Sequence, residues 1–107
     1  MDDDRSQRIR KAKRLIARHP DRVPVIVTPS NLNMSMVKFL PHKESKVGEF
    51  MVNLRGYIQK LNKSDALLFF VSETLPPLTG EIGELYKKHA DSDGYLHVTL
   101  SRESTFG

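Results

Sequence analysis

The strongest pattern of apolar and polar positions lies in the middle of the chain, where apolar residues recur three or four positions apart. These residues are Val47, Phe50, Met51, Leu54, Ile58 and Leu61. Because residues with this spacing share one face of an α-helix, we predict a long helix over residues 47–61, with Ser45 as its N-cap. A shorter stripe at positions 9, 12 and 16 predicts a helix over residues 6–19.

Four short segments have the composition of β-strands, namely residues 23–28, 36–40, 66–71 and 95–101. The third, A-L-L-F-F-V, is apolar throughout, which predicts a strand that is covered on both faces. The fourth alternates, so Leu96, Val98 and Leu100 are expected on one buried face. Between these two segments, Thr79 is a candidate N-cap for a short third helix.

The predicted order is helix, strand, strand, long helix, strand, short helix, strand. A strand pair, a helix that crosses over and two further strands that return to one sheet describe an α+β fold of the β-grasp type. We expect a four-stranded mixed sheet with the long helix packed on it and an added N-terminal helix. The expected units are a basic helical segment (1–22), the β-grasp domain (23–101) and a flexible tail ending in glycine (102–107).

Composition limits the possible chemistry. The chain has 107 residues and no cysteine, which excludes a disulfide framework, a thiolate zinc site and a cysteine nucleophile. The four histidines show no metal-ligand spacing, and the chain contains no phosphate-binding loop or nucleophile motif, so we expect no metal, no cofactor and no enzymatic activity. No apolar run is long enough for a membrane span or a signal peptide.

The net charge of +4 comes from one segment. Residues 1–22 carry eight lysines and arginines against four aspartates, whereas the remaining residues carry nine charges of each sign. A cationic helix attracts nucleic acid, an anionic membrane and an acidic protein through the same Coulomb interaction, so these alternatives stay open. The near absence of aromatic rings among the basic residues argues against RNA.

Several blocks of sequence carry a resemblance to a known family. They are P-D-R-V-P-V-I-V (20–27), K-F-L (38–40), V-G-E-F (47–50), D-A-L-L-F-F-V (65–71), G-E-L-Y (83–86) and E-S-T-F-G (103–107). In order and spacing they closely resemble the autophagy ubiquitin-like modifiers, the family of GABARAP, microtubule-associated light chain three and the yeast Atg-eight protein. The resemblance covers nearly all of residues 20–107 and implies a ubiquitin-like β-grasp.

The resemblance also implies how the chain would work. Family members are not enzymes: activating and conjugating enzymes of the autophagy cascade join the terminal glycine, here Gly107, to phosphatidylethanolamine, and a cysteine protease processes or delipidates them. We therefore expect a monomer in the cytoplasm that moves to the autophagosome membrane when lipidated, and no nucleic-acid partner. Glycine suits this position because an unbranched residue with wide φ/ψ freedom enters narrow enzyme sites easily.

The second implied activity is binding of aromatic-x-x-aliphatic motifs of cargo receptors, with the peptide added as a strand beside the second strand. The resemblance assigns the aromatic pocket to Leu15, Pro24, Ile26, Lys38, Leu40 and Tyr95. It assigns the aliphatic pocket to Phe39, Pro41 and Phe50, with Arg22 and Arg55 facing acidic residues that flank the motif.

In and around the two pockets the chain differs from the usual family sequence at four positions, Lys11, Pro41, Ser45 and Asn53. Family members often have two N-terminal helices, and here the first is expected to be missing or reduced. Two other functions remain open on the residues alone. One is a peptide-binding adaptor that is not conjugated. The other is a small basic domain that binds microtubules or nucleic acid.

Overall fold

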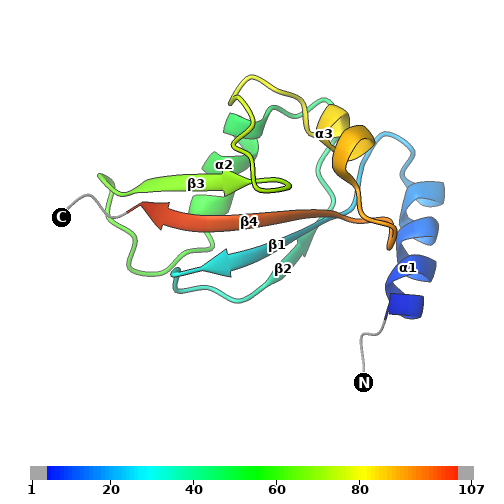
Figure 1. Cartoon of the computed structure of the whole chain (residues 1–107), viewed down its shortest axis with the longest axis horizontal. Helices are drawn as coiled ribbons and strands as arrows, with labels where there is room; N and C mark the ends of the chain where they lie inside the picture. The colour runs from blue at the N-terminus through cyan, green and yellow to red at the C-terminus, as the bar shows by residue number, and fades with distance from the viewer. Residues whose placement is uncertain (1–4, 104–107) are drawn as a thin grey trace.

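The computed structural model describes residues 5–103, and its elements follow the predicted order (Figure 1). They are α1 (Arg5–Arg18), β1 (Val25–Ser30), β2 (Val37–Phe39), α2 (Val47–Arg55), β3 (Ala66–Phe70), α3 (Ile82–His89) and β4 (Leu96–Glu103). Within the described residues, no helix has the length and apolar character needed to cross a membrane.

The strands form one mixed sheet in the order β2-β1-β4-β3. The central strands β1 and β4 are parallel, with Val25 opposite Leu96, and each outer strand pairs antiparallel with its inner neighbour. The predicted four-stranded mixed sheet of a β-grasp is therefore confirmed. This order leaves β2 and β3 at the two edges.

The main core lies between the sheet and the helices α2 and α3. Alternate residues of the inner strands point into it, among them Val25, Val27 and Val98, and α2 contributes Phe50 and Leu54. The expected burial of alternate β4 residues is confirmed, because Leu96, Val98 and Leu100 are all buried.

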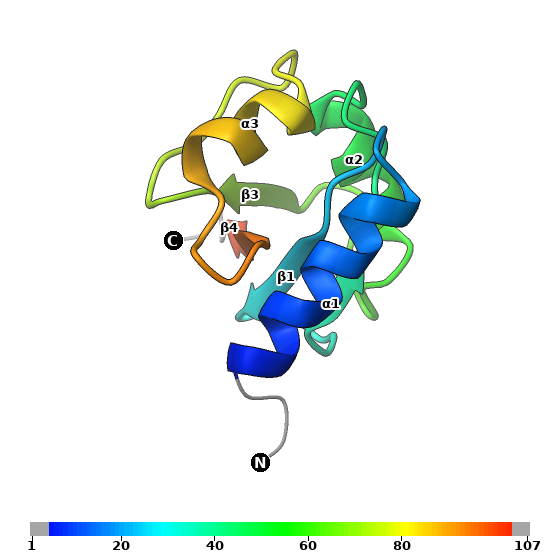
Figure 2. The same cartoon turned by 90° about the vertical axis from the view of Figure 1, so that its right-hand side faces the viewer.

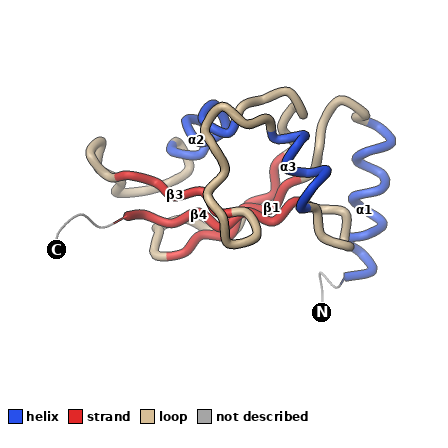
Figure 3. The backbone as a smooth tube through the Cα atoms, turned by 45° about the horizontal axis from the view of Figure 1, so that its top comes forward, coloured by secondary structure: helices blue, strands red, loops and turns tan. Residues whose placement is uncertain are grey.

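A second, smaller cluster consists of Ala12, Ile26 and Tyr95. Ile26 lies between Val25 and Val27 in β1, so its side chain points to the opposite face of the sheet. The helix α1 covers this face near one end of the sheet, and the C-terminal end of β4 lies at the other end (Figures 1 and 3). Figure 2 views the molecule from the end that carries α1.

The helix α2 ends at Arg55, so the prediction of one long helix to residue 61 is wrong. After Leu54 the backbone turns more tightly: the amides of Gly56, Tyr57 and Ile58 each bond to the carbonyl three residues earlier. Ile58 is nevertheless buried, and Leu61 packs on the core from the turns that follow. The apolar spacing therefore predicted correctly that Ile58 and Leu61 contact the core, although it placed them in the helix and they lie beyond its end.

The predicted N-caps also differ from the structure. The cap of α2 is Lys46, whose amide donates to Glu49 Oε1 at 3.0 Å, and not Ser45. The cap of α3 is Glu81 and not Thr79. In both cases the cap residue has extended backbone and forms a bridge with the other one, so pairing of Lys46 with Glu81 decides where the two helices begin.

The prediction that residues 66–71 are covered on both faces is wrong. In β3, which lies at an edge of the sheet, Leu67 and Phe69 are buried, whereas Ala66 is exposed and Leu68 and Phe70 are only partly buried. Its partner β4 continues to Glu103, opposite Ala66, two residues past the expected domain boundary at 101. Residues 1–4 and 104–107, including Gly107, lie outside the described residues.

Candidate peptide-binding site

The outer edge of β2 is the first component of the site. This strand pairs with β1 through Val37, Lys38 and Phe39, and no other described strand pairs with it. An edge strand presents backbone N–H and C=O groups that can pair with an added strand. The fold thus offers an extended peptide a place to bind.

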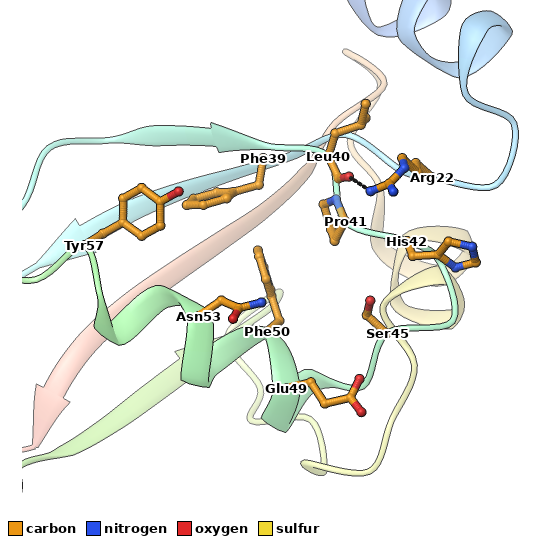
Figure 4. Close-up of a pocket in the computed structure, with 10 residues that line it drawn as sticks. All are labelled: Arg22, Phe39, Leu40, Pro41, His42, Ser45, Glu49, Phe50, Asn53 and Tyr57. Atoms are coloured by element: carbon orange, nitrogen blue, oxygen red, sulfur yellow. Dashed lines mark hydrogen bonds between the residues drawn. The ribbon is translucent and has the colours of Figure 1, made fainter.

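A pocket of about 530 Å³ opens beside this edge, between β2 and α2 (Figure 4). We call it the Phe50 pocket. Its lining residues are Arg22, Phe39, Leu40, Pro41, His42, Ser45, Glu49, Phe50, Asn53 and Tyr57. The structure brings together in it the three residues predicted for the aliphatic pocket, Phe39, Pro41 and Phe50.

Aromatic rings form the apolar side of the Phe50 pocket. The Phe39 and Phe50 rings meet edge to face with centroids 5.4 Å apart, and Tyr57 packs on Phe39 in the same way at 5.1 Å. Phe50 itself continues into the core through Phe69, at 6.0 Å. Such edge-to-face pairs hold their rings in defined orientations, so the apolar side of the pocket is preformed.

Arg22 holds the segment that leaves β2. Its Nη1 donates to the Leu40 carbonyl oxygen at 3.0 Å, and the Val23 amide donates to the Pro41 carbonyl at 3.1 Å. These bonds place Leu40 and Pro41 against the start of β1. Arg22 also lines the Phe50 pocket, so it fixes the position of the pocket wall, and its contact with acidic residues that flank the motif stays a prediction.

Arg55, the other predicted contact for acidic flanking residues, does not line the Phe50 pocket. Its Nη2 donates to the carbonyl oxygens of Asn62 at 3.3 Å and Asp65 at 3.2 Å. These bonds tie the C-terminal end of α2 to the turn before β3. The structure thus gives Arg55 a bracing position and does not place it next to Arg22.

The residues predicted for the aromatic pocket lie at the end of the sheet near α1, and the pocket itself stays a prediction. Of its six residues, Pro24, Ile26 and Tyr95 are buried and form a floor. The side chains left accessible are Leu15, Lys38 and Leu40. Lys38 Nζ lies 5.8 Å from the centre of the Tyr95 ring, within reach of a cation–π interaction, so Lys38 lies over this floor.

Sequence reasoning missed a buried ionic cluster that anchors α1 beside this floor. Asp93 is buried, and its Oδ2 lies 3.0 Å from Arg8 Nε and 2.9 Å from His97 Nε2. Burial alone would raise the pKa of Asp93. The hydrogen bonds that it accepts, led by one from the Tyr95 amide at 2.9 Å, outweigh burial and hold the pKa below its usual range.

The same cluster has three potential metal ligands. Ligand atoms of Asp91, Asp93 and His97 lie within 4.8 Å of one another. Both Asp93 oxygens, however, already accept hydrogen bonds from within the protein. We therefore assign Asp93 to anchoring α1. The sequence signal was slight, an Asp-Gly turn and one arginine 85 positions earlier.

A mixed sheet of this order, with a helix across one face, defines a ubiquitin-like protein. The chain belongs to the Atg8 family, since the family model described as "Autophagy protein Atg8 ubiquitin like" matches residues 7–107. It is 38% identical to autophagy-related protein 8e of Arabidopsis thaliana over 112 residues, covering 100% of this chain and 90% of the relative. It is 33% identical to autophagy-related protein 8 of Dictyostelium discoideum, covering 90% of this chain and 82% of the relative.

Solved structures agree. The crystal structure of Trypanosoma brucei ATG8 superposes with a TM-score of 0.86 at 32% identity, covering 100% of this chain and 95% of that one. Plasmodium falciparum Atg8, solved in complex with a Plasmodium falciparum Atg3 peptide, superposes with a TM-score of 0.81 at 28% identity. The match covers 96% of this chain and 94% of that one. The predicted family and ubiquitin-like fold are confirmed, and the protein is a ubiquitin-like modifier of autophagy.

Proposed function

We propose that this protein binds aromatic-x-x-aliphatic peptides along β2 and is conjugated through Gly107 to phosphatidylethanolamine. The observation that carries the peptide proposal is that the Phe50 pocket opens directly beside the unpaired edge of β2. The Atg3 peptide in the Plasmodium relative supports a partner from the conjugation cascade. Cargo receptors and other autophagy proteins with the same motif are the further proposed partners.

The spacing of the motif fits the two faces of the sheet. In an extended peptide, residues i and i+3 point to opposite sides of the strand. In β2 the neighbours Lys38 and Phe39 also point to opposite sides, one over the Tyr95 floor and the other against Phe50. A peptide strand added at this edge would therefore send its aromatic residue towards α1 and its aliphatic residue into the Phe50 pocket.

A titration followed by backbone NMR tests the peptide proposal. With an aromatic-x-x-aliphatic peptide we expect the largest amide shifts at Val37, Lys38 and Phe39 and at residues lining the Phe50 pocket. The matched control peptide is one residue shorter, aromatic-x-aliphatic, which places both anchors on one side of the strand and should bind at least about tenfold more weakly. Equal binding of both peptides, or shifts that avoid β2, would overturn the proposal.

The conjugation proposal rests on family membership, since the matching family model extends to Gly107. We propose that activating and conjugating enzymes transfer the Gly107 carboxyl to the lipid amine, and that a cysteine protease processes or removes the product. The chain itself has no enzymatic role in this proposal. A two-chain lipid supplies the two hydrophobic anchors that stable membrane attachment requires, so the cytoplasmic protein would move to the autophagosome.

The test is the intact mass of the protein recovered from the membrane fraction of cells that carry the autophagy machinery. We expect the mass of the lipid adduct for the wild type and no adduct for Gly107→Ala. Peptide binding should be the same for both, because none of the residues proposed to bind the peptide is changed. A wild-type protein that recruits receptors without any adduct would instead identify an adaptor that is not conjugated.

A further inference from the structure

The Phe50 pocket has two chemically different sides. The side formed by β2 and the floor of the pocket are apolar, and they consist of Phe39, Pro41 and Phe50. Figure 4 shows Phe39 near the top of the view and the other two nearer its centre. The side nearest α2 carries the polar residues Ser45, Glu49 and Asn53. A side chain that enters this pocket therefore meets rings on one side and hydrogen-bonding groups on the other.

Several polar groups around the pocket are already engaged. Glu49 Oε1 accepts a hydrogen bond from the Lys46 amide, and Arg22 donates to the Leu40 carbonyl. His42 Nδ1 accepts from the Glu44 amide at 3.2 Å. These bonds hold the three side chains in place around the pocket.

Ser45 and Asn53 differ from them. Within residues 5–103, Ser45 forms hydrogen bonds only through its backbone, to His42 and Ile82, and its hydroxyl has no partner. The Asn53 amide side chain likewise has no partner among the described residues. A hydroxyl and an amide that face a peptide pocket can each donate and accept a hydrogen bond.

We propose that the polar side of the Phe50 pocket lets it accept threonine as well as valine at the second anchor, the aliphatic position of the motif. This inference rests on the proposed peptide-binding function. Threonine and valine have nearly the same shape, so they differ mainly in whether the hydroxyl finds a partner. In a purely apolar pocket, a buried hydroxyl without a partner is disfavoured. Here the threonine methyl contacts the Phe39 and Phe50 rings while Ser45 or Asn53 bonds the hydroxyl.

The experiment compares two peptides that are identical except for valine or threonine at the second anchor, titrated into the full chain by calorimetry. A purely apolar site separates such a pair by roughly 100-fold, whereas we expect the two Kd values here to lie within about fivefold. The double variant Ser45→Ala, Asn53→Leu removes the hydroxyl and the amide from the polar side and leaves Glu49 bonded to the Lys46 amide. The preference for valine should then rise to about 30-fold or more.

A variant outside the pocket serves as the control. Val52→Leu places an added apolar group at the neighbouring, exposed position of α2, outside the pocket, and should leave the ratio unchanged.

The outcomes separate this inference from the function on which it rests. If neither peptide binds, the peptide-binding function fails and the inference with it. If valine binds and threonine is rejected about 100-fold by the wild type, the inference is overturned while the binding function stands. The inference is also overturned if the double variant still binds both peptides with similar Kd values. Ser45 and Asn53 would then not determine which residue is accepted at the second anchor.

Discussion

The two faces of the sheet are stabilised in different ways. The face under α2 and α3 carries a continuous core that includes Val25, Leu54 and Val98. The face under α1 carries a much smaller apolar cluster of Ala12, Ile26 and Tyr95, and the ionic cluster at Asp93 holds the helix there. Apolar burial thus sets the stability of the domain, whereas a few specific contacts decide whether α1 stays in place beside the proposed aromatic pocket.

The largest expected effect comes from the main core. Leu54→Ala removes a fully buried side chain from α2 and should lower the free energy of unfolding by about 2–5 kcal/mol, measured by urea denaturation. Val52→Ala, in the same helix but 69% exposed, is the control and should change stability by less than about 0.5 kcal/mol. Equal effects of the two changes would contradict the assignment of this face as the core.

An intermediate effect is expected where α1 meets the turn before β4. Gly94 has φ +88°, and a Cβ placed on it would lie 2.6 Å from the Ala12 Cβ, so Gly94→Ala strains the turn and pushes the turn and α1 apart. We expect a loss of about 1–3 kcal/mol, with faster hydrogen exchange concentrated in α1. Peptide affinity should fall as well, because Leu15 would leave the proposed aromatic pocket.

The matched control for that change is Gly56→Ala. Gly56 has φ −68°, and an added Cβ would make an ordinary 3.5 Å contact with the Asn53 carbonyl oxygen. This variant should be neutral or slightly stabilising, because alanine reduces the freedom of the unfolded chain. Exchange in Gly94→Ala that rises equally in β1 and β4 would mean that α1 is not a separate unit.

The smallest expected effect is the pH dependence of the α1 anchor. The pKa of Asp93 is lower in the folded protein than its usual value, so the cluster stabilises the fold fully above the unfolded pKa of about 3.9. This stabilisation is lost as the pH falls from about 4 through the lower folded pKa. Hydrogen exchange of α1 between pH 5 and pH 2 measures it.

In Asp93→Asn the pH-dependent part of this anchoring should disappear, while α1 exchanges faster already at pH 5. The main core supplies the comparison. Asp93→Asn should reduce the hydrogen-exchange protection of β1 and β4 much less than that of α1. An unchanged pH dependence in the variant would show that other carboxyl groups, and not Asp93, control the anchor.

The alternation of Leu96, Val98 and Leu100 and the helical spacing around Phe50 predicted the elements of the fold, because local periodicity reports which face is buried. The same periodicity overestimated the length of α2, because residues that follow a helix can remain buried in turns, as Ile58 does. It also misjudged β3, because the order of strands, and not the apolar run, decides which strand lies at an edge.

For the candidate site, the resemblance supplied Phe39, Pro41 and Phe50, and the structure places all three around one pocket. It also supplied Arg55, which the structure turns towards Asn62 and Asp65. The contact between Arg8 and Asp93 joins residues 85 positions apart, and neither has a periodic pattern that would connect them.

The sequence by itself determined the elements, their order and the family, because periodic burial and contiguous motifs are local properties of the chain. Only the tertiary structure decided that β3 lies at an edge, that α1 is held by a buried carboxylate, and that Arg55 bonds to the turn before β3 and does not line the Phe50 pocket. Those features depend on which distant segments come together. Such pairing follows from the packing of the whole chain, which no single stretch of residues specifies.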